Sequence, residues 1–455
     1  MIKKVLIANR GEIAVRIIRA CKEMGIYTVA VYSEVDKKSL HVELANYAVC
    51  IGGARASDSY LHMDNIIQAA CNTGCDAIHP GFGFLSENAK FVRLVEECGL
   101  IFIGPKSSII DMLGNKSEAR NLMASVGVPI IPGSKDIIAN AQQGIVLAKD
   151  IGYPVIVKAS NGGGGRGMRI IYQEDDFAHL FDAAKAEAKV CFGDDEMYLE
   201  KYIEGPKHIE VQVLGDNFGN VVHLYERDCS FQRRNQKLIE EAPCHVLDGK
   251  IRSDLFDAAL KACQTVGYNS VGTIEFLVDK HGHYYFMEMN TRIQVEHPIT
   301  EMVSGVDIVK HQIRVADNQV LNIKQEDIAC QGYAIECRIN AEDIRNDFKP
   351  DPNTIQFLHL PGGKGIRIDG AVYNGYTISP FYDSMILKLI SFAPTRLEAI
   401  KKMRVALEEL IIDGPKNNIE FHYLAMHHPK FVEGKYDTKF CELFVEELKA
   451  NGEFI

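Results

Sequence analysis

Three side chains with oxygen ligands are spaced so that they can meet on one face of a sheet. Glu275 lies in the apolar run GTIEFLVD, and Glu288 and Asn290 lie in the run YYFMEMN. A two-residue turn near residues 281–282 would place all three on the same face, whereas a three-residue loop would break this register. Mg²⁺ prefers hard oxygen ligands and usually also takes substrate phosphates. The spacing predicts a metal site, and the alternative is a solvated polar sheet face.

Polar residues continue to alternate with apolar ones after this run, at Arg292, Gln294 and Glu296. Drawn as a straight strand from Glu288, the run would extend about 26 Å, which is too long for one small reaction centre. We therefore expect the chain to bend after Asn290 and to deliver the second group to a neighbouring pocket. An arginine fork matches a carboxylate or bicarbonate. A glutamate beside it can take a proton from the bound acid.

A glycine-rich run, NGGGGRG at 161–167, joins two segments that are typical of strands. It is not a P-loop, because Met168 and Arg169 follow it where that motif has Lys and Ser/Thr, and no helix is expected behind it. We interpret the run as a flap whose backbone N–H groups bind phosphate. Arg166 and Lys158 would add positive charge. The alternative is a plain hairpin loop at the surface.

The elements that must position these residues begin with an alternation of strands and helices over the first 110 or so residues. Strands are expected at 3–8, 28–32, 76–79 and 100–103, and helices at 13–24, 64–71 and 89–98. This order predicts a parallel, doubly wound α/β domain. Its first turn, NRG at 9–11, has a single glycine and so disfavours a dinucleotide site.

The pattern changes in the later part of the chain, where helices are followed by short strands and then by a further alternation of strands and helices. Helices are expected at 116–126 and 396–410, and strands at 154–159, 168–172, 209–214, 221–227, 273–278, 284–288 and from 332 onward. Thr395 and Glu398 form a capping box ahead of the last helix.

The glycine flap, the strand lysine and the acidic pair together resemble the ATP-grasp fold, in which two α+β subdomains clamp ATP and one of them is a hinged lid. Longer runs narrow the resemblance to the biotin carboxylase branch: HPGFGFLSEN at 79–88, FQRRNQKLIEEAP at 231–243, EMNTRIQVEHPITE at 288–301, ECRINAED at 336–343 and LEELIIDGPKNN at 407–418. These runs cover essentially the whole chain, in order.

This resemblance implies a fold that combines α/β and α+β domains. A doubly wound N-terminal biotin carboxylase domain is expected at 1–113. An ATP-grasp domain with a mobile lid at about 132–204 is expected at 114–330, and a C-terminal biotin carboxylase domain at 331–455. The run YLEKYI at 198–203 is expected to cross from lid to body beneath the adenine of ATP.

Enzymes of this branch use ATP with Mg²⁺ or Mn²⁺ to phosphorylate bicarbonate, and N1′ of biotin captures the CO₂ released from carboxyphosphate. The resemblance implies ATP contacts at Lys116, Lys158, Gly162, Gly163, Gly164, Gly165, Arg166, Gly167, Glu200, Lys201, Ile203, His208, Gln232, Asn235, Glu275 and Glu288. It implies metal ligands at Glu275, Glu288 and Asn290, and bicarbonate contacts at Lys237, Arg292, Gln294, Val295 and Glu296.

The implied catalytic residues are Glu296, Arg338, Arg292 and Lys237. Glu296 would take the proton of bicarbonate, and Arg338 would stabilise the enolate of biotin, since its guanidinium stays charged. The alternative for Arg338 is a structural salt bridge to Glu336 or Asp343. Phe82, also assigned to biotin, stands where the family often has tyrosine, and Asn235 stands where histidine is frequent.

Composition limits the partners. A net charge of −11 argues against nucleic acid, and no apolar run is long enough for a membrane span. Twelve scattered cysteines and no signal peptide favour the cytoplasm. The resemblance implies a homodimer. The sequence contains no Ala-Met-Lys-Met motif and no carboxyltransferase region, so we expect biotin from a carboxyl carrier protein and the next step from carboxyltransferase subunits.

The main hypothesis is therefore the first half-reaction of acetyl-CoA carboxylase, in fatty acid synthesis. One alternative is the biotin carboxylase subunit of a pyruvate or other acyl-CoA carboxylase. A second alternative is a non-catalytic ATP-sensing ATP-grasp module, which would not need Glu296.

Overall fold

The N-terminal part of the chain forms a five-stranded parallel sheet, and the predicted doubly wound domain is confirmed. The computed structural model describes residues 1–160 and 166–452. The strands, in the spatial order β3-β2-β1-β4-β5, are β1 (Lys4–Ile7), β2 (Tyr27–Ser33), β3 (Tyr47–Gly52), β4 (Ala77–His79) and β5 (Ile101–Phe102). The helices are α1 (Gly11–Glu23), α2 (Leu40–Leu44), α3 (Met63–Thr73) and α4 (Ala89–Glu97). The sequence did not predict β3, which is an edge strand and mostly exposed or half-buried.

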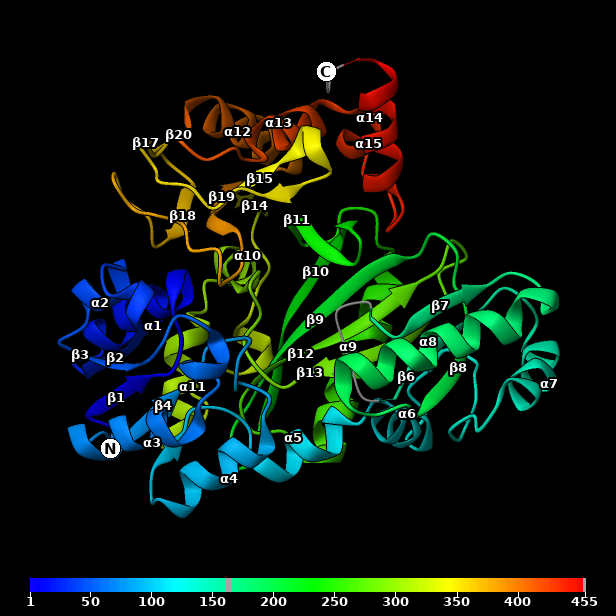
Figure 1. The fold of residues 1–455 in the computed structure, drawn as a ribbon, viewed down its shortest axis with the longest axis horizontal. Helices are drawn as coiled ribbons and strands as arrows, with labels where there is room; N and C mark the ends of the chain where they lie inside the picture. The colour runs from blue at the N-terminus through cyan, green and yellow to red at the C-terminus, as the bar shows by residue number, and fades with distance from the viewer. Residues whose placement is uncertain (161–165, 453–455) are drawn as a thin grey trace.

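One antiparallel sheet of eight strands forms the centre of the molecule (Figure 1). In spatial order its strands are β13 (Tyr284–Asn290), β12 (Val271–Val278), β9 (Lys207–Gly215), β10 (Val221–Arg233), β11 (Gln236–Ala242), β14 (Tyr333–Asn340), β19 (Met385–Ala393) and β18 (Ile366–Gly370). The predicted domain division at 330 falls between β11 and β14, which pair directly. Strands on both sides of the division thus share one sheet, and the division remains a prediction.

The segment predicted as the lid has a sheet and a core of its own. Its sheet has the order β7-β6-β8, with β6 (Val155–Ala159), β7 (Met168–Ile171) and β8 (Met197–Lys201), and is covered by α7 (Ala141–Ile151) and α8 (Phe177–Phe192) (Figure 1). Its buried residues pack as one cluster that includes Val157, Phe181 and Leu199. The two strands predicted around the glycine run are confirmed, and they pair antiparallel. Residues 161–165, including the predicted ATP contacts Gly162, Gly163, Gly164 and Gly165, lie outside the described residues.

Helices complete the central and C-terminal parts. They are α5 (Ser107–Gly114), α6 (Lys116–Ser125), α9 (Gly249–Val266), α10 (His297–Ser304), α11 (Ile308–Ala316), α12 (Arg396–Glu409), α13 (Ile419–His427), α14 (Pro429–Val432) and α15 (Phe440–Ala450). Short strands β15 (Glu342–Asp343), β16 (Lys349–Pro350), β17 (Phe357–His359) and β20 (Ile411–Asp413) form two small ribbons. The Thr395 hydroxyl accepts from the N–H of Glu398 at 3.3 Å, so the predicted cap of α12 is present. Within 1–160 and 166–452, none of the helices has the length and apolarity needed to span a bilayer.

Candidate active site

Glu275 and Glu288 share a sheet face as predicted, but for a different reason. The turn between β12 and β13 spans residues 279–283, an odd number rather than the two residues that the prediction assumed. That loop alone would place Glu275 opposite Met287. A register shift between Glu275 and Phe276 corrects it, so Glu275 pairs with Glu288 and Thr273 pairs with Asn290. Such β-bulges are common beside active sites, where they redirect side chains.

The predicted bend after Asn290 is confirmed, because β13 ends there and residues 291–296, which we call the anion loop, lead to α10. Four hydrogen bonds fix the Arg292 guanidinium, one of them from Nη1 to the carbonyl of Ile293 at 3.2 Å. Its Nε donates to Glu87 Oε2 at 2.8 Å, Nη2 to Asn290 Oδ1 at 3.0 Å and Nη1 to Gln294 Oε1 at 3.3 Å. The arginine is therefore held with its fork along the loop, between the metal-ligand candidates and the predicted base.

Lys237 on β11 lies at the centre of the acidic residues. Its ammonium hydrogen-bonds Glu296 Oε1 at 2.7 Å and Glu275 Oε1 at 3.2 Å, and it also contacts Glu210 on β9. Gln294 Nε2 donates to the same Glu275 oxygen at 3.0 Å. Burial lowers the pKa of Lys237, but the charges of Glu275 and Glu296 raise this pKa by more, so its net shift is upward. The lysine is thus a permanent cation at the point where the two predicted subsites meet.

Glu296 is fully buried between two cations. Lys237 contacts one of its oxygens, and Arg338 Nη2 donates to Oε2 at 3.0 Å. Burial raises the pKa of Glu296, but Lys237 and Arg338 outweigh it and hold the pKa below its ordinary value. The side chain is therefore a carboxylate that is able to accept a proton.

The alternative partners expected for Arg338, Glu336 and Asp343, are not the ones it binds. Besides Glu296, its guanidinium donates to Glu240 Oε1 at 2.6 Å. Both carboxylates are fully buried, so Arg338 joins a buried acidic pair that includes the predicted base.

The lysines predicted to bind ATP each form an ion pair with an acidic residue. Lys116, the first residue of α6, lies 2.6 Å from Glu288 Oε2, and Lys158 on β6 lies 2.6 Å from Glu200 Oε2. Burial lowers the pKa of Lys116, but Glu288 more than compensates and the net shift is upward. The first pair joins α6 to β13 of the central sheet, and the second joins two strands of the predicted lid.

His208 and Gln232 connect this region to the acidic centre. His208 Nε2 lies 3.0 Å from Glu275 Oε2, and Gln232 Nε2 is 2.7 Å from His208 Nδ1. Ligand atoms of His208, Glu210 and Glu275 lie within 4.8 Å of one another. The described residues therefore place two predicted ATP contacts at the edge of the metal-ligand candidates.

Other predicted contacts lie further from this centre. Asn235 is exposed in the turn between β10 and β11, with φ 62°. The Lys201 ammonium donates hydrogen bonds to the carbonyls of Gly152 and Tyr153, both at 2.9 Å. Ile203 follows the end of β8 and is half-buried, and Arg166 is exposed.

Among the lid and biotin predictions, Gly167 adopts φ 65°, a conformation that favours glycine. Phe82 is half-buried against a cluster formed by residues of both the N-terminal and the central parts of the chain, and its carbonyl accepts from Asn9 Nδ2 at 2.7 Å.

Sequence reasoning missed several acidic partners of the site residues. Glu210 contacts Lys237 and accepts from Arg227 Nη2 at 3.0 Å. A signal was available, because HIEVQVLG at 208–215 alternates polar and apolar residues within a segment read only as a strand. Glu87 and Glu240 had no comparable signal, since each depends on a distant strand or loop for its role.

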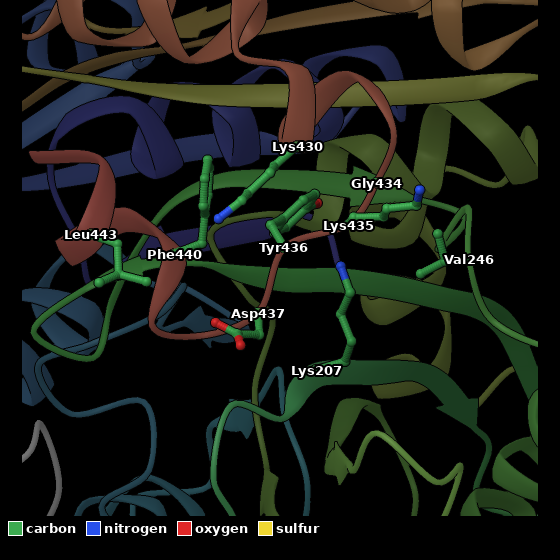
Figure 2. A pocket seen from close by; sticks show the side chains of 9 residues that line it. All are labelled: Lys207, Val246, Lys430, Gly434, Lys435, Tyr436, Asp437, Phe440 and Leu443. Carbon is green, nitrogen blue, oxygen red and sulfur yellow. The ribbon is translucent and has the colours of Figure 1, made fainter. Parts of the chain in front are cut away.

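A separate cavity of about 330 Å³ lies between the start of β9 and the C-terminal helices α14 and α15 (Figure 2). It is lined by Lys207, Val246, Lys430, Gly434, Lys435, Tyr436, Asp437, Phe440 and Leu443. None of the predicted site residues lines it, so the candidate active site and this cavity are distinct.

Three family profiles match successive parts of the chain. They are the N-terminal domain of biotin carboxylase at 1–110, the ATP-binding domain of the carbamoyl-phosphate synthase L chain at 115–324 and the C-terminal domain of biotin carboxylase at 336–443. The chain is also 54% identical over 445 residues to biotin carboxylase 1 of Bacillus subtilis, covering 98% of this chain and 99% of the relative.

Solved structures agree with these matches. A biotin carboxylase from Campylobacter jejuni in an ATP-type complex has a TM-score of 0.96 at 50% identity, covering 97% of this chain and 99% of that one. The biotin carboxylase domain dimer of Hydrogenobacter thermophilus 2-oxoglutarate carboxylase, bound to MgADP, ADP and bicarbonate, has a TM-score of 0.95 at 50% identity, covering 97% and 98%. The chain belongs to the biotin carboxylase family of ATP-dependent ligases.

Proposed function

We propose that this chain uses ATP to phosphorylate bicarbonate and then carboxylates biotin presented by a carrier protein. The observation that carries the proposal is the placement of Glu296, a buried carboxylate that hydrogen-bonds both Lys237 and Arg338. A module that only senses ATP has no need for a proton acceptor at that point. The same network extends through Glu275 toward the residues assigned to the nucleotide.

The first step requires bicarbonate to be held, deprotonated and aligned with ATP. Arg292, fixed by Glu87, offers a fork for the anion, and Lys237 adds a compact positive charge. Glu296 takes the proton of bicarbonate while a bicarbonate oxygen bonds to the γ-phosphorus. The bond from that phosphorus to the β–γ bridging oxygen breaks, and ADP leaves with the electron pair.

The second step requires an acceptor nitrogen to lose its proton. Carboxyphosphate breaks down to CO₂ and phosphate, the released phosphate takes the proton of N1′ of biotin, and N1′ forms its new bond to the carbon of CO₂. Negative charge develops on the ureido oxygen as the nitrogen is deprotonated. Arg338 stabilises that charge, because its guanidinium is permanently positive and already lies beside the base.

The donor set near Glu275 fits a divalent cation. Glu275, Glu288 and Asn290 supply oxygen ligands from one sheet face, and Asn290 Nδ2 lies 2.8 Å from Glu275 Oε1. When bound, Mg²⁺ or Mn²⁺ would neutralise charge on the phosphate oxygens. Lys116, which now pairs with Glu288, would then be available to the nucleotide.

We further propose that the chain works as a cytoplasmic homodimer with a biotin carboxyl carrier protein and carboxyltransferase subunits, as in acetyl-CoA carboxylase. The identity to biotin carboxylase 1 of Bacillus subtilis supports this assignment. A related complex that carboxylates a 2-oxo acid is the second candidate, because the Hydrogenobacter thermophilus domain is nearly as similar. Identification of the biotinylated protein that copurifies with the chain would separate the two.

The direct test measures ADP formation by the purified chain with ATP and Mg²⁺, with and without bicarbonate and free biotin. We expect turnover to require bicarbonate and to rise with biotin, together with transfer of labelled bicarbonate carbon to biotin. ATP binding without bicarbonate-dependent turnover would contradict the proposal and would favour the sensing module.

A further inference from the structure

Lys388 is a second buried cation on the sheet face that carries Arg338. It lies on β19, where it pairs directly opposite Arg338 of β14, and its side chain is 0% exposed. Directly opposite residues on neighbouring strands project to the same face. No motif that supports the family resemblance includes Lys388, and none of the roles assigned above requires it.

The Lys388 ammonium reaches the backbone of the anion loop. Its Nζ donates to the carbonyl of Val295 at 2.8 Å. That carbonyl belongs to the peptide unit joining Val295 to Glu296. The neighbouring cations of the sheet thus hold the same residue at two points, since Arg338 binds the Glu296 side chain and Lys388 binds the peptide immediately before it.

The counter-ion of Lys388 comes from the N-terminal domain. Glu12, on the first turn of α1, lies 3.1 Å from the ammonium. Asp369, opposite Lys388 on β18, is already engaged by Arg367 through hydrogen bonds of 2.9 and 2.7 Å. Lys388 therefore joins the N-terminal domain, the anion loop and the C-terminal strands at one buried point.

We propose that Lys388 is a positioning residue for the reaction: it fixes the backbone that presents Glu296 to bicarbonate and couples that position to the N-terminal domain through Glu12. This inference rests on the proposed function. The anion loop is irregular, so its carbonyls lack the strand pairing that would otherwise fix them. A charge-assisted hydrogen bond supplies that constraint, and a displacement of about 1 Å at a reacting group costs as much as 10²-fold in rate.

The test compares Lys388→Met and Lys388→Arg with Arg396→Met. Arg396 is a matched control, because it is also buried, pairs with a carboxylate (Glu241) and donates to backbone carbonyls at 2.7 Å, but those carbonyls belong to Phe431 and Val432. Each variant is assayed for kcat and for the KM of ATP and of bicarbonate, normalised to folded protein. The wild type is measured first, and its failure to turn over would contradict the proposed function rather than this inference.

We expect Lys388→Met to lower kcat about 10- to 100-fold while the KM of ATP changes less than about twofold. Lys388→Arg should recover part of kcat, because it keeps a donor at the loop. Arg396→Met should lose stability but keep kcat. A wild-type kcat in Lys388→Met, an equal loss in Arg396→Met, or a parallel rise in the KM of ATP would each overturn the inference.

Discussion

At the nucleotide end of the site, Lys116 and Glu288 form a single ion pair, and each side chain is 29% exposed. At the bicarbonate end, Glu296 is fully buried and is shared by Lys237 and Arg338, each of which also binds another carboxylate. A one-to-one pair at the edge can exchange its partner for a ligand at low cost. A buried shared network cannot, because removal of one member leaves the others charged and unpaired. We therefore expect the Lys116–Glu288 pair to exchange its partner for a ligand and the network around Glu296 to keep a fixed geometry.

The strongest challenge to this comparison is Glu296→Gln, which keeps the shape but cannot accept the proton. We expect kcat to fall about 10²- to 10⁴-fold, with the KM of ATP changed less than about twofold. Steady-state kinetics check this. Glu241→Gln is the control, since it is the same change at a buried carboxylate that pairs with Arg396, and it should keep kcat. Normal turnover by Glu296→Gln would show that the proton acceptor is another group.

Arg338→Gln separates the two half-steps at the bicarbonate end. Transfer of carbon to biotin should fall about 10²- to 10³-fold, the usual effect of removing one donor to a developing oxyanion. The KM of ATP should stay close to the wild-type value. Arg338→Lys keeps the charge but loses the fork, so its loss should be smaller. A rise in the KM of ATP as large as the loss of transfer would contradict the separation of the two ends.

Lys116→Met tests the nucleotide end. We expect the KM of ATP to rise about tenfold, equivalent to about 1.4 kcal/mol, with the KM of bicarbonate unchanged. Lys149→Met removes an exposed lid lysine that pairs with Glu174 at 2.8 Å, and it should change neither constant because surface pairs contribute little. Equal effects of the two variants on the KM of ATP would contradict the assignment of Lys116 to nucleotide binding.

The smallest expected effect is on the pH dependence of stability. The folded-state pKa of Glu296 is lowered, chiefly because Lys237 and Arg338 outweigh burial. Its contribution to the unfolding free energy is therefore present above the ordinary glutamate pKa, and it is lost as the pH falls below that value toward the folded pKa. The difference in urea-unfolding free energy between wild type and Glu296→Gln should be constant from pH 7 to about 5 and shrink at lower pH. If this free-energy difference instead grew as the pH fell, the folded-state pKa of Glu296 would be raised rather than lowered.

The sequence predicted the polar residues of the site better than it predicted how they are held. Alternation along 288–296 predicted both groups of polar residues, because a strand period of two is a local property. The odd loop at 279–283 and the compensating bulge were not predictable, since a bulge depends on cross-strand pairing. The resemblance supplied Lys237 and Arg338 but not their further partners Glu210 and Glu240.

Residues that act over long sequence separations were the ones missed. Glu12, Glu87 and Lys388 contact the anion loop or its cations only after three segments fold together. The eight-stranded sheet was likewise not predicted, because the pairing of β11 with β14 joins strands from two predicted domains. The parallel N-terminal sheet was predicted because each of its βαβ units is contiguous in the chain.

The most direct test of the central claim is a crystal structure of the chain with a non-hydrolysable ATP analogue, Mg²⁺ and bicarbonate. We expect the cation at the oxygens of Glu275, Glu288 and Asn290, and bicarbonate between Arg292 and Lys237 with Glu296 within hydrogen-bonding distance. A cation or a bicarbonate ion bound away from these residues would contradict the account.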